Sequence, residues 1–537
     1  GVRKLYQCVV LLILSGEPRL NLKMERKILI ILCLALCKCF GRKILCVFST
    51  PSFGHHVAYT TIAEVLHRRG HELTILTTNL HNYTNPDSGR INQIDLGPPS
   101  QKVLKSKLKT IDLENYNRNK MLDTYYDTML KITDAQLEVP EVKELLRNTV
   151  ETFDLLIVEA YTPTWFALAE IFKVPIVSVS ATHTTLQNFD SMDNPTHPFL
   201  YPDVLTSYSG RLSFFKRLNL VYRSIQFRWN YYYNILPKFE ALAVKHFGNN
   251  STPVGLMEKK TDLMLVNIHP LFVGPRPTVP GVVFLGHIHM QPPNPIPDVK
   301  AFVSAKEKGF ILFNLGASIQ SQNLPLEKIN VLTTAFSTLD YNIIWKWENI
   351  TLIGHPMNLM TYPWCPQFDI LAHPKIKAFI TQGGLRSVEE AIYHKVPIIG
   401  MPIAGDQYFN VARLVHLGVG VHLDYKTLSK ESTKAEINLI QFCRYKNRIT
   451  ELSNMIEDDP IPPLEKAIRW IDHILLFGDA KHLKTPAQHY PMYQILFLDI
   501  AGFLLAVSIC GFFCLRFVLK KAMQKIFGPK ASIYYFN

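Results

Sequence analysis

Two adjacent histidines, His55 and His56, lie in the loop after the first strand-like run of the chain. A histidine titrates near neutral pH, so it can take a proton from an attacking hydroxyl, and a neighbouring carboxylate can orient its ring. Glu159 ends a later strand-like run whose first acidic residue is Asp154. Ligands bind at the carboxyl ends of parallel strands, which selects Glu159 as the partner. A loop histidine alone is more often a solvated residue, so this pair needs support from elsewhere.

A second group of residues could bind a nucleotide diphosphate. Gly383 and Gly384 lie between a strand expected over 378–381 and a helix expected over 385–393. The backbone N–H groups and the dipole at that helix start would receive phosphate, and Ser387 can add a hydroxyl donor. Trp364 offers a flat apolar face to a base, although a lone Trp is more often a core residue.

Alternating strand and helix patterns must position both groups. Strands are expected over 43–49, 71–77, 154–158 and 175–180, with helices over 57–69 and 165–172. After the Pro-rich break at 291–297 the pattern restarts, with strands over 310–315, 342–347, 378–381 and 397–400, helices over 327–339 and 385–393, and another helix after Asp406. Two runs of βα units predict an α/β protein with two Rossmann-like domains facing a cleft. Neither first turn carries G-x-G-x-x-G, which counts against a nicotinamide dehydrogenase.

The stretch from Trp364 to Gln407 resembles the signature of the UDP-glycosyltransferase family, which includes the UDP-glucuronosyltransferases. The resemblance extends over essentially the whole mature chain and is closest in kind to arthropod members. It implies a GT-B fold, with acceptor bound mainly by the N-terminal domain and donor by the C-terminal one. It also implies an interval between the catalytic histidine and Gly70 that favours His55 over His56. The donor-site residues that it implies are Trp364 for uracil, Gln367 and Glu390 for ribose, Gln382, Gly383, Gly384 and Ser387 for the diphosphate, with Gly316 and Ala317 as further phosphate contacts, and Asp406 and Gln407 for the sugar.

Several positions depart from the family pattern. Gln382 stands where the family often has His, so the phosphate site loses a charge. Asn314 and Ala317 stand where Ser is common, and Ala317 cannot donate a hydrogen bond. His287 replaces a common Gly, and Glu159 replaces a common Asp. These changes could tune the donor or reduce activity. The combination of Gln382 with Glu159 is similar to arthropod members, which favours UDP-glucose over UDP-glucuronate.

The resulting expectation is an enzyme that transfers a hexose, with inversion, from a UDP-sugar to a hydroxyl of a small lipophilic acceptor. His55 would be the base and Glu159 would orient it. No cofactor is expected beyond the UDP-sugar co-substrate. No metal is expected either, because the sequence offers no Asp-x-Asp pair to hold one. The alternative is a non-catalytic, UDP-sugar-binding or partner-regulating membrane protein. Acceptor identity and oligomeric state stay open, with a homo-oligomer among the alternatives.

Targeting patterns predict a single-pass type I protein of the endoplasmic reticulum membrane. The expected order is an upstream or artefactual segment over 1–23, a signal peptide over 24–41, an acceptor domain over 42–290, a linker over 291–300, a donor domain over 301–480, a stem over 481–494, a transmembrane helix over 495–519 and a cytosolic tail over 520–537. Glycosylation sequons at Asn82, Asn249, Asn250 and Asn349 fit a lumenal body.

The net charge of +13 is dispersed, and a lumenal body rarely meets nucleic acid, so no nucleic-acid partner is expected. Residues 211–233 nevertheless mix basic and aromatic side chains. Three interpretations stay open for them: an apolar acceptor wall, a surface resting on the membrane, or plain core packing.

Overall fold

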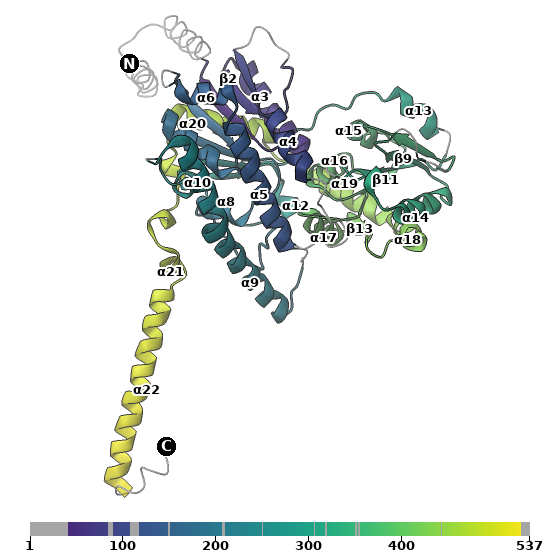
Figure 1. Ribbon diagram of the computed structural model, residues 1–537. Coiled ribbons are helices and arrows are strands. Elements are labelled where there is room, and N and C mark those ends of the chain that lie inside the picture. Colours follow the sequence, from purple (N-terminus) through teal and green to yellow (C-terminus); the bar gives the residue numbers. More distant parts are fainter. Residues whose placement is uncertain are drawn as a thin grey trace, which may run out of the picture. The chain divides into compact units, whose positions relative to one another are not determined.

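The computed structural model describes residues 41–83, 90–107, 118–148, 151–206, 210–249, 251–304, 307–316, 319–349, 352, 355–441 and 443–527. The predicted signal peptide and the segment before it lie almost wholly outside these residues. One compact unit ends at His482 and a second begins at Leu483. The first unit contains two parallel sheets in two α/β domains, as the strand and helix pattern predicted (Figure 1).

The first domain is built on a seven-stranded sheet in the order β3-β2-β1-β4-β5-β6-β7. Its strands are β1 Lys43–Phe48, β2 Glu72–Thr77, β3 Ile91–Asp95, β4 Leu155–Glu159, β5 Ile176–Ser180, β6 Leu263–Val266 and β7 Val282–Phe284. Strands β4, β5 and β6 are buried along their whole length, as expected when helices cover both faces of a parallel sheet. The helices of this domain are α3 Phe53–Arg68, α4 Gly97–Lys107, α5 Arg118–Leu137, α6 Pro140–Arg147, η2 Pro163–Ala167, α7 Leu168–Phe172, α8 Leu186–Ser191, α9 Phe214–Asn230, η3 Tyr231–Ile235, α10 Leu236–Phe247, α11 Val254–Lys259 and α12 Pro270–Val273.

The second domain has a six-stranded sheet in the order β10-β9-β8-β11-β12-β13. Its strands are β8 Phe310–Asn314, β9 Asn342–Lys346, β10 Leu359–Tyr362, β11 Ile376–Thr381, β12 Ile398–Gly400 and β13 Gly420–His422. The order reverses between β8 and β11, and the carboxyl ends of strands at such a switch point form a natural ligand crevice. Helices α13 Pro297–Ser304, η4 Ser321–Asn323, α14 Leu326–Ser337, α15 Gln367–Leu371, α16 Leu385–Tyr393, α17 Gln407–Leu417, α18 Lys430–Ile440 and α19 Cys443–Glu457 complete it.

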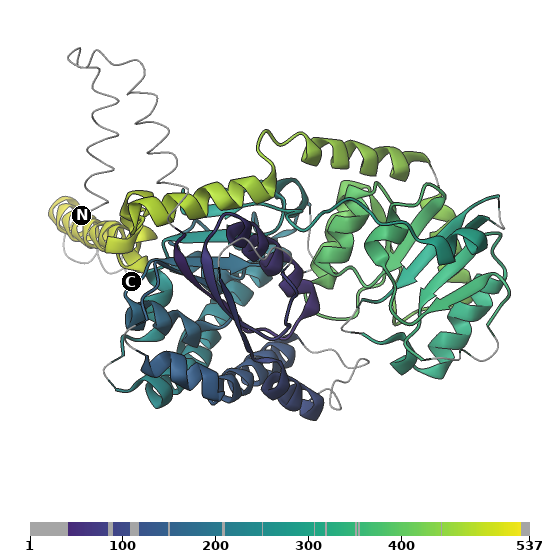
Figure 2. The same ribbon diagram turned by 90° about the horizontal axis from the view of Figure 1, so that it is seen from above.

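Helix α20, Pro463–Phe477, returns to the first domain, although the sequence prediction grouped it with the second. It packs on α3 and β6 and lies along the blue domain in Figure 2. Its apolar face, which includes Ile468 and Ile471, is buried there. Polar contacts fix the same position: Arg69 pairs with Asp472, and Asp262 accepts from the Ala480 N–H at 3.0 Å. The physical reason is that this face needs an apolar partner, which the first domain supplies.

The short helix η5 Lys481–Leu483 spans the boundary between the two units. The second unit continues with the short helices η6 Pro486–His489 and α21 Met492–Ile495, and then the long helix α22 Leu498–Phe527. Within the described part of the chain, α22 is the one helix long and apolar enough to cross a membrane, over Leu498–Ile526. It begins three residues after the predicted start at 495 and runs past the predicted end at 519.

A buried carboxyl group, Glu258 at the end of α11, should make the stability of the first domain depend on pH. Burial raises its pKa from 4.5 to about 8, and Tyr231 donates to it. Folding therefore holds a proton that the unfolded chain releases above pH 4.5, so this contribution to stability is complete below that pH and is lost as pH rises towards 8. We expect Glu258→Gln to flatten the fall in melting temperature over this range, measured by scanning fluorimetry. The exposed Glu431→Gln is the matched control, and an equal flattening there would contradict the assignment.

Candidate functional site

The structure brings His55 and Glu159 together at the carboxyl ends of β1 and β4. His55 lies in the first turn of α3, and its Nδ1 is 3.1 Å from Glu159 Oε1. The other carboxylate oxygen accepts from the Thr50 N–H at 2.9 Å. Burial alone would raise the pKa of Glu159, but the hydrogen bonds from His55 and from the Thr50 N–H oppose it, and the pKa lies below its usual range. The ionised carboxylate can only accept, so it fixes the proton on Nδ1 and leaves the Nε2 lone pair of His55 free to act as a base.

His56 occupies a different environment although it is the next residue. Its ring is buried, with Nε2 3.0 Å from the Thr50 carbonyl and 2.8 Å from Thr78 Oγ1. Nδ1 lies 3.2 Å from Thr77 Oγ1. Burial lowers the pKa of His56, against the opposing effects of Glu159 and the Thr50 carbonyl. Both ring nitrogens of His56 are thus engaged inside the domain, so this residue fixes the start of α3 rather than facing a ligand.

Trp364 lies where the two domains meet, and its indole is more than half exposed. The ring of Phe53, two residues before His55, meets it nearly at right angles, with ring centroids 5.4 Å apart. On the second-domain side, Lys346 Nζ lies 5.7 Å from the Trp364 ring centroid. Lys346 ends β9, is almost fully buried, and donates to the Gly316 carbonyl at 3.0 Å and to Glu348 at 2.7 Å. An exposed aromatic face next to a buried cation is suited to a base and its attached phosphates.

Hydrogen bonds from Gln367 link it to Ser387 and to Glu390. Gln367 Nε2 donates to Glu390 Oε2 at 2.6 Å and to Ser387 Oγ at 3.1 Å. Asn314 donates to Gln367 Oε1 at 2.7 Å, and Arg386 donates to Glu390 Oε1 at 2.8 Å. Burial raises the pKa of Glu390, against the opposing effects of Arg386 and Gln367. The predicted ribose-binding side chains therefore converge and are held in fixed rotamers.

The predicted diphosphate turn has the geometry that close backbone approach requires. Gly384 caps α16, and Gly383 before it adopts a φ of +85°, where a Cβ would come within 2.6 Å of Val411. Gly316 faces this turn from the β8 loop with a φ of +78°, where a Cβ would come within 2.6 Å of Gln382 Nε2. Both glycines thus adopt a left-handed backbone conformation that residues with a Cβ rarely take, and each lies against a neighbouring side chain. Ala317, the other predicted phosphate contact, lies outside the described residues.

Gln407, the first residue of α17, is fixed from both ends of its amide. Its Oε1 accepts from the N–H groups of Ile403 and Ala404, both at 2.9 Å. Its Nε2 donates to Gln382 Oε1 at 3.0 Å. This bond leaves the Gln382 amide nitrogen facing Gly316, where it can donate to a phosphate.

A chain of contacts runs from Asp406 back to the first domain. Asn410 donates to Asp406 Oδ2 at 3.0 Å and to the Gly383 carbonyl at 2.9 Å. His183 of the first domain lies 2.6 Å from Asn410 Oδ1, and its carbonyl accepts from Tyr161 at 2.5 Å. The Tyr161 ring lies 5.6 Å from that of His55. The predicted sugar-binding residue and the predicted base thus lie at the two ends of one series of contacts, which passes through the main-chain carbonyl of His183 and the ring of Tyr161.

Several of these residues were missed in the sequence. Five residues that the structure brings to the site belong to no motif of their own, namely Lys346, Asn410, His183, Tyr161 and Arg386. For Lys346 a signal was available, because it lies near the carboxyl end of the strand expected over 342–347, and the carboxyl end of a strand was the argument that selected Glu159. His183 and Asn410 meet only through the packing of one domain on the other, which a linear pattern does not contain.

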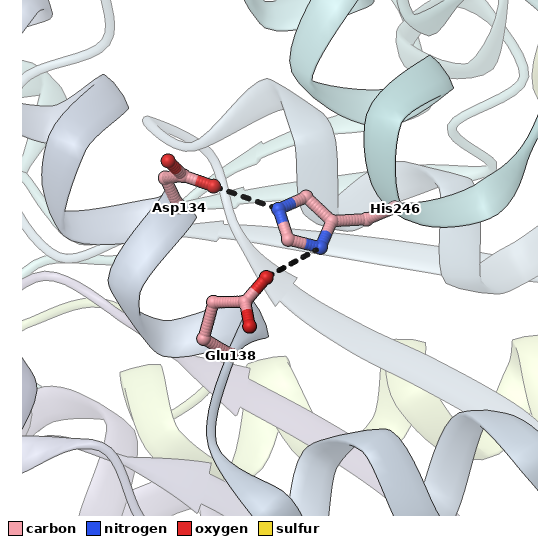
Figure 3. A group of neighbouring side chains, drawn as sticks. All are labelled: Asp134, Glu138 and His246. Carbon is pink, nitrogen blue, oxygen red and sulfur yellow. Dashed lines mark hydrogen bonds and ion pairs between the residues drawn. The ribbon is translucent and has the colours of Figure 1, made fainter.

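One further cluster has the composition of a metal site. Asp134, Glu138 and His246 offer ligand atoms within 4.8 Å of one another, and Figure 3 shows the imidazole with one nitrogen facing each carboxylate. Each carboxylate also accepts from a lysine, Asp134 from Lys245 at 2.6 Å and Glu138 from Lys143 at 2.5 Å. These ammonium groups already balance the negative charge, so the cluster fits an ion-pair network that fastens α5 and α6 to α10.

Comparison with known proteins places this geometry among glycosyltransferases. The family model described as UDP-glucoronosyl and UDP-glucosyl transferase matches residues 43–532. UDP-glycosyltransferase UGT5 of Dactylopius coccus is 33% identical, over 73% of this chain and 76% of that protein. The ecdysteroid UDP-glucosyltransferase of Spodoptera littoralis nuclear polyhedrosis virus is 29% identical, over 85% and 93%. UDP-glucuronosyltransferase 2B15 of Homo sapiens is 29% identical, over 89% and 97%. Among solved structures, the calicheamicin glycosyltransferase CalG4 superposes with a TM-score of 0.54 at 18% identity, over 81% of this chain and 98% of its own, which supports the GT-B fold.

Proposed function

Because this chain belongs to the family of UDP-glucoronosyl and UDP-glucosyl transferases and is thus a glycosyltransferase that uses a UDP-sugar, we propose that it transfers a hexose, with inversion, to a hydroxyl of a small lipophilic acceptor. The observation that carries this proposal is the pairing of His55 Nδ1 with Glu159 Oε1 at 3.1 Å. The pair lies on the first domain, across from the donor-site residues of the second.

In the proposed reaction, His55 Nε2 takes the proton of the acceptor hydroxyl as its oxygen attacks the anomeric carbon. The new bond from that carbon to the acceptor oxygen forms while the bond to the β-phosphate oxygen breaks, and UDP leaves with the electron pair. Glu159 stabilises the imidazolium that results. The N–H groups at the start of α16 and the amide of Gln382 stabilise the charge on the departing diphosphate, a role that needs no metal or other cofactor.

We propose UDP-glucose rather than UDP-glucuronate as the donor. The viral relative is named a glucosyltransferase and the human one a glucuronosyltransferase, so relatives alone do not decide. The support comes from Asp406, the residue proposed to lie at the sugar, whose carboxylate accepts from Asn410 at 3.0 Å. A carboxylate there favours neutral hydroxyls over a second carboxylate. A donor competition assay on the purified full chain, following UDP release with a panel of phenols, tests this. Preference for UDP-glucuronate would reject the donor assignment.

A non-catalytic, UDP-sugar-binding role is the second candidate. The observation in its favour is that Gln382, whose amide is bonded to Gln407 at 3.0 Å, brings no positive charge to the departing diphosphate. The same assay separates the two functions. UDP binding without UDP release under any donor and acceptor pair would favour the non-catalytic role.

We propose that α22 anchors the chain in the endoplasmic reticulum membrane with the body in the lumen. Support comes from its length and apolar composition and from the lysines that follow its apolar run. A lumenal body exposes the sequons at Asn82 and Asn349 to glycosylation. Endoglycosidase treatment of the expressed protein should therefore lower its apparent mass, and protease added to sealed microsomes should spare the body. Digestion of the body in sealed microsomes would reverse the orientation.

A further inference from the structure

Arg276, in the segment between α12 and β7, is a mostly buried cation that lacks a hydrogen-bonding partner. Its guanidinium lies over the rings of Phe189 and Tyr201, with Cζ 5.4 and 5.8 Å from the two ring centroids. Within the described part of the chain, Arg276 donates no hydrogen bond and forms no ion pair, and its Nε is closed off from solvent. A guanidinium has five N–H donors, and buried donors without a partner cost free energy. Such a group points to a ligand that supplies the missing acceptor.

Arg228 provides a comparison in the same region of the first domain. Its guanidinium donates to both oxygens of Asp190, at 2.7 and 2.8 Å, and to Thr196 Oγ1 at 2.8 Å. Burial alone would lower the pKa of Arg228, but the bonds and the charge of Asp190 raise it above its usual value. For Arg276 the effect of burial prevails and lowers the pKa to about 10. The fold thus supplies acceptors to one of these buried cations and not to the other.

Arg276 lines a hollow of about 270 Å³ that is partly open to solvent. Thr184 lines the same hollow, and its Oγ1 is buried without a partner among the residues that the structure describes. Leu186 and Phe189 of α8 form an apolar wall. A few convergent polar groups beside an apolar wall are typical of a small-molecule site, and this hollow has the size of a part of a ligand. It therefore fits a small group that carries acceptor oxygens on an apolar body.

The charges near the hollow favour an anion over a neutral group. The positive charge of Arg413 also lowers the pKa of Arg276, whereas the negative charge of Asp203 raises it. Asp203 lines the hollow, and Arg413 Nε is bonded to the uncharged Phe272 carbonyl at 2.9 Å. Two guanidinium groups beside one carboxylate leave a net positive charge. A further carboxylate would balance it, and a guanidinium can bind a carboxylate through two parallel N–H bonds.

The hollow lies at the same edge of the first sheet as the proposed base. Thr184 follows β5, while His55 and Glu159 lie at the carboxyl ends of β1 and β4, and these three strands are neighbours in the order β1-β4-β5. The carbonyl of His183, the residue before Thr184, accepts from Tyr161, whose ring lies 5.6 Å from that of His55. The hollow therefore adjoins the part of the first domain where an acceptor meets the base.

We propose that Arg276 binds the carboxylate of an acceptor that carries a hydroxyl and a carboxylate on one apolar body. The inference rests on the proposed transfer function and narrows its acceptors from lipophilic compounds in general to lipophilic hydroxy acids. Arg276 donates two N–H bonds to the carboxylate, and the Thr184 hydroxyl donates a third. The rings of Phe189 and Tyr201 keep water away from this ion pair, which strengthens it.

Two acceptors that differ only in their charge test this proposal. The probes are para-coumarate and its methyl ester, each titrated against the purified full chain without donor and then assayed with UDP-glucose. We expect the acid to bind more tightly than the ester. Arg276→Met removes the charge at similar side-chain length, so it should weaken binding of the acid by about 10- to 100-fold and leave the ester unchanged. Arg276→Lys should retain part of the preference, because it keeps the charge without the paired N–H groups.

Arg469→Met is the matched control, because Arg469 is an exposed residue of α20 that pairs with Glu465, and it should alter the binding of neither probe. Equal affinity of the unmodified chain for acid and ester would overturn the proposal. Equal weakening of both probes in Arg276→Met would also overturn it. Melting temperatures show which variants are folded, and the comparison of acid with ester in the unmodified chain decides even if Arg276→Met does not fold.

Acetate and inorganic phosphate serve as probes for a site that binds free anions. Binding of either anion that is lost in Arg276→Met, beside equal affinity for acid and ester, would show a free-anion site and reject the acceptor assignment. The titrations without donor keep this test separate from the proposed function. A preference for the acid without any transfer would support the subsite and count against catalysis. Transfer to both probes without a preference would support catalysis and reject the subsite.

Discussion

Replacing His55 with Ala is expected to lower the rate of glycosyl transfer by about 10²–10⁴-fold, the usual contribution of a general base. The affinity for the UDP-sugar should stay nearly unchanged, because His55 lies on the first domain and its hydrogen bond goes to Glu159 rather than to a donor-site residue. Turnover under saturating donor and a titration of UDP binding measure the two quantities separately. Glu159→Gln should lower turnover as well, because an amide can also bond Nδ1 in the wrong tautomer.

His56→Ala is the matched control for this prediction. His56 is buried and bonded to Thr50 and Thr78, so its loss should lower the melting temperature and affect turnover only through the loop. A folded His56→Ala protein without activity, beside an active His55→Ala protein, would show that the base is the other histidine.

We expect Trp364 and Asp406 to have different roles in the donor site, with Trp364 binding the base and Asp406 acting on the sugar. Trp364→Ala removes the face expected to stack on uracil, so it should weaken UDP and every UDP-sugar by a similar factor. Stacking of a base on an aromatic side chain contributes about 1–3 kcal/mol, which is roughly 5- to 150-fold in affinity. Asp406→Asn should leave UDP affinity almost unchanged and lower turnover, because this residue is expected to act on the transferred sugar.

Titrating UDP and UDP-glucose against both variants gives four affinities to compare. Phe53→Leu is a useful control for the Trp364 variant, because the Phe53 ring contacts the indole from the other domain. A small effect of Phe53→Leu on UDP affinity would show that the loss in Trp364→Ala comes from the base. Equal loss of UDP binding in the Trp364 and Asp406 variants would show that the two residues do not have separate roles. It would also contradict the assignment of the donor site.

The fold could be predicted because its central strands are long apolar runs with clear turns. Strands β1, β4, β8 and β11 all lie within one or two residues of their expected bounds. The sequence did not reveal β3, whose alternating pattern is half polar, or β13, which has three residues. The sequence also did not show which domain α20 packs on, because the apolar face of a helix carries no information about the domain that it will cover.

The site was predictable to the extent that its residues follow strands or begin helices. His55 and Glu159 converge because β1 and β4 are neighbours in the sheet, and Gly384 and Ser387 share one turn of α16. The contacts of Asn410 with His183 and of Phe53 with Trp364 cross between domains. Only the packing of the two domains creates them, so no local pattern could have indicated them.

The path of α20 has a consequence for dissecting this enzyme into fragments. A fragment that ends at residue 290 would leave the surfaces of α3 and β6 uncovered and Asp262 without the Ala480 N–H. A fragment over 301–480 would carry α20 with its apolar face open to water. The recombinant unit that preserves both domains is therefore the continuous body through residue 482. Two fragments produced separately should be poorly soluble alone and should become soluble when co-expressed, because each supplies the surface that the other lacks.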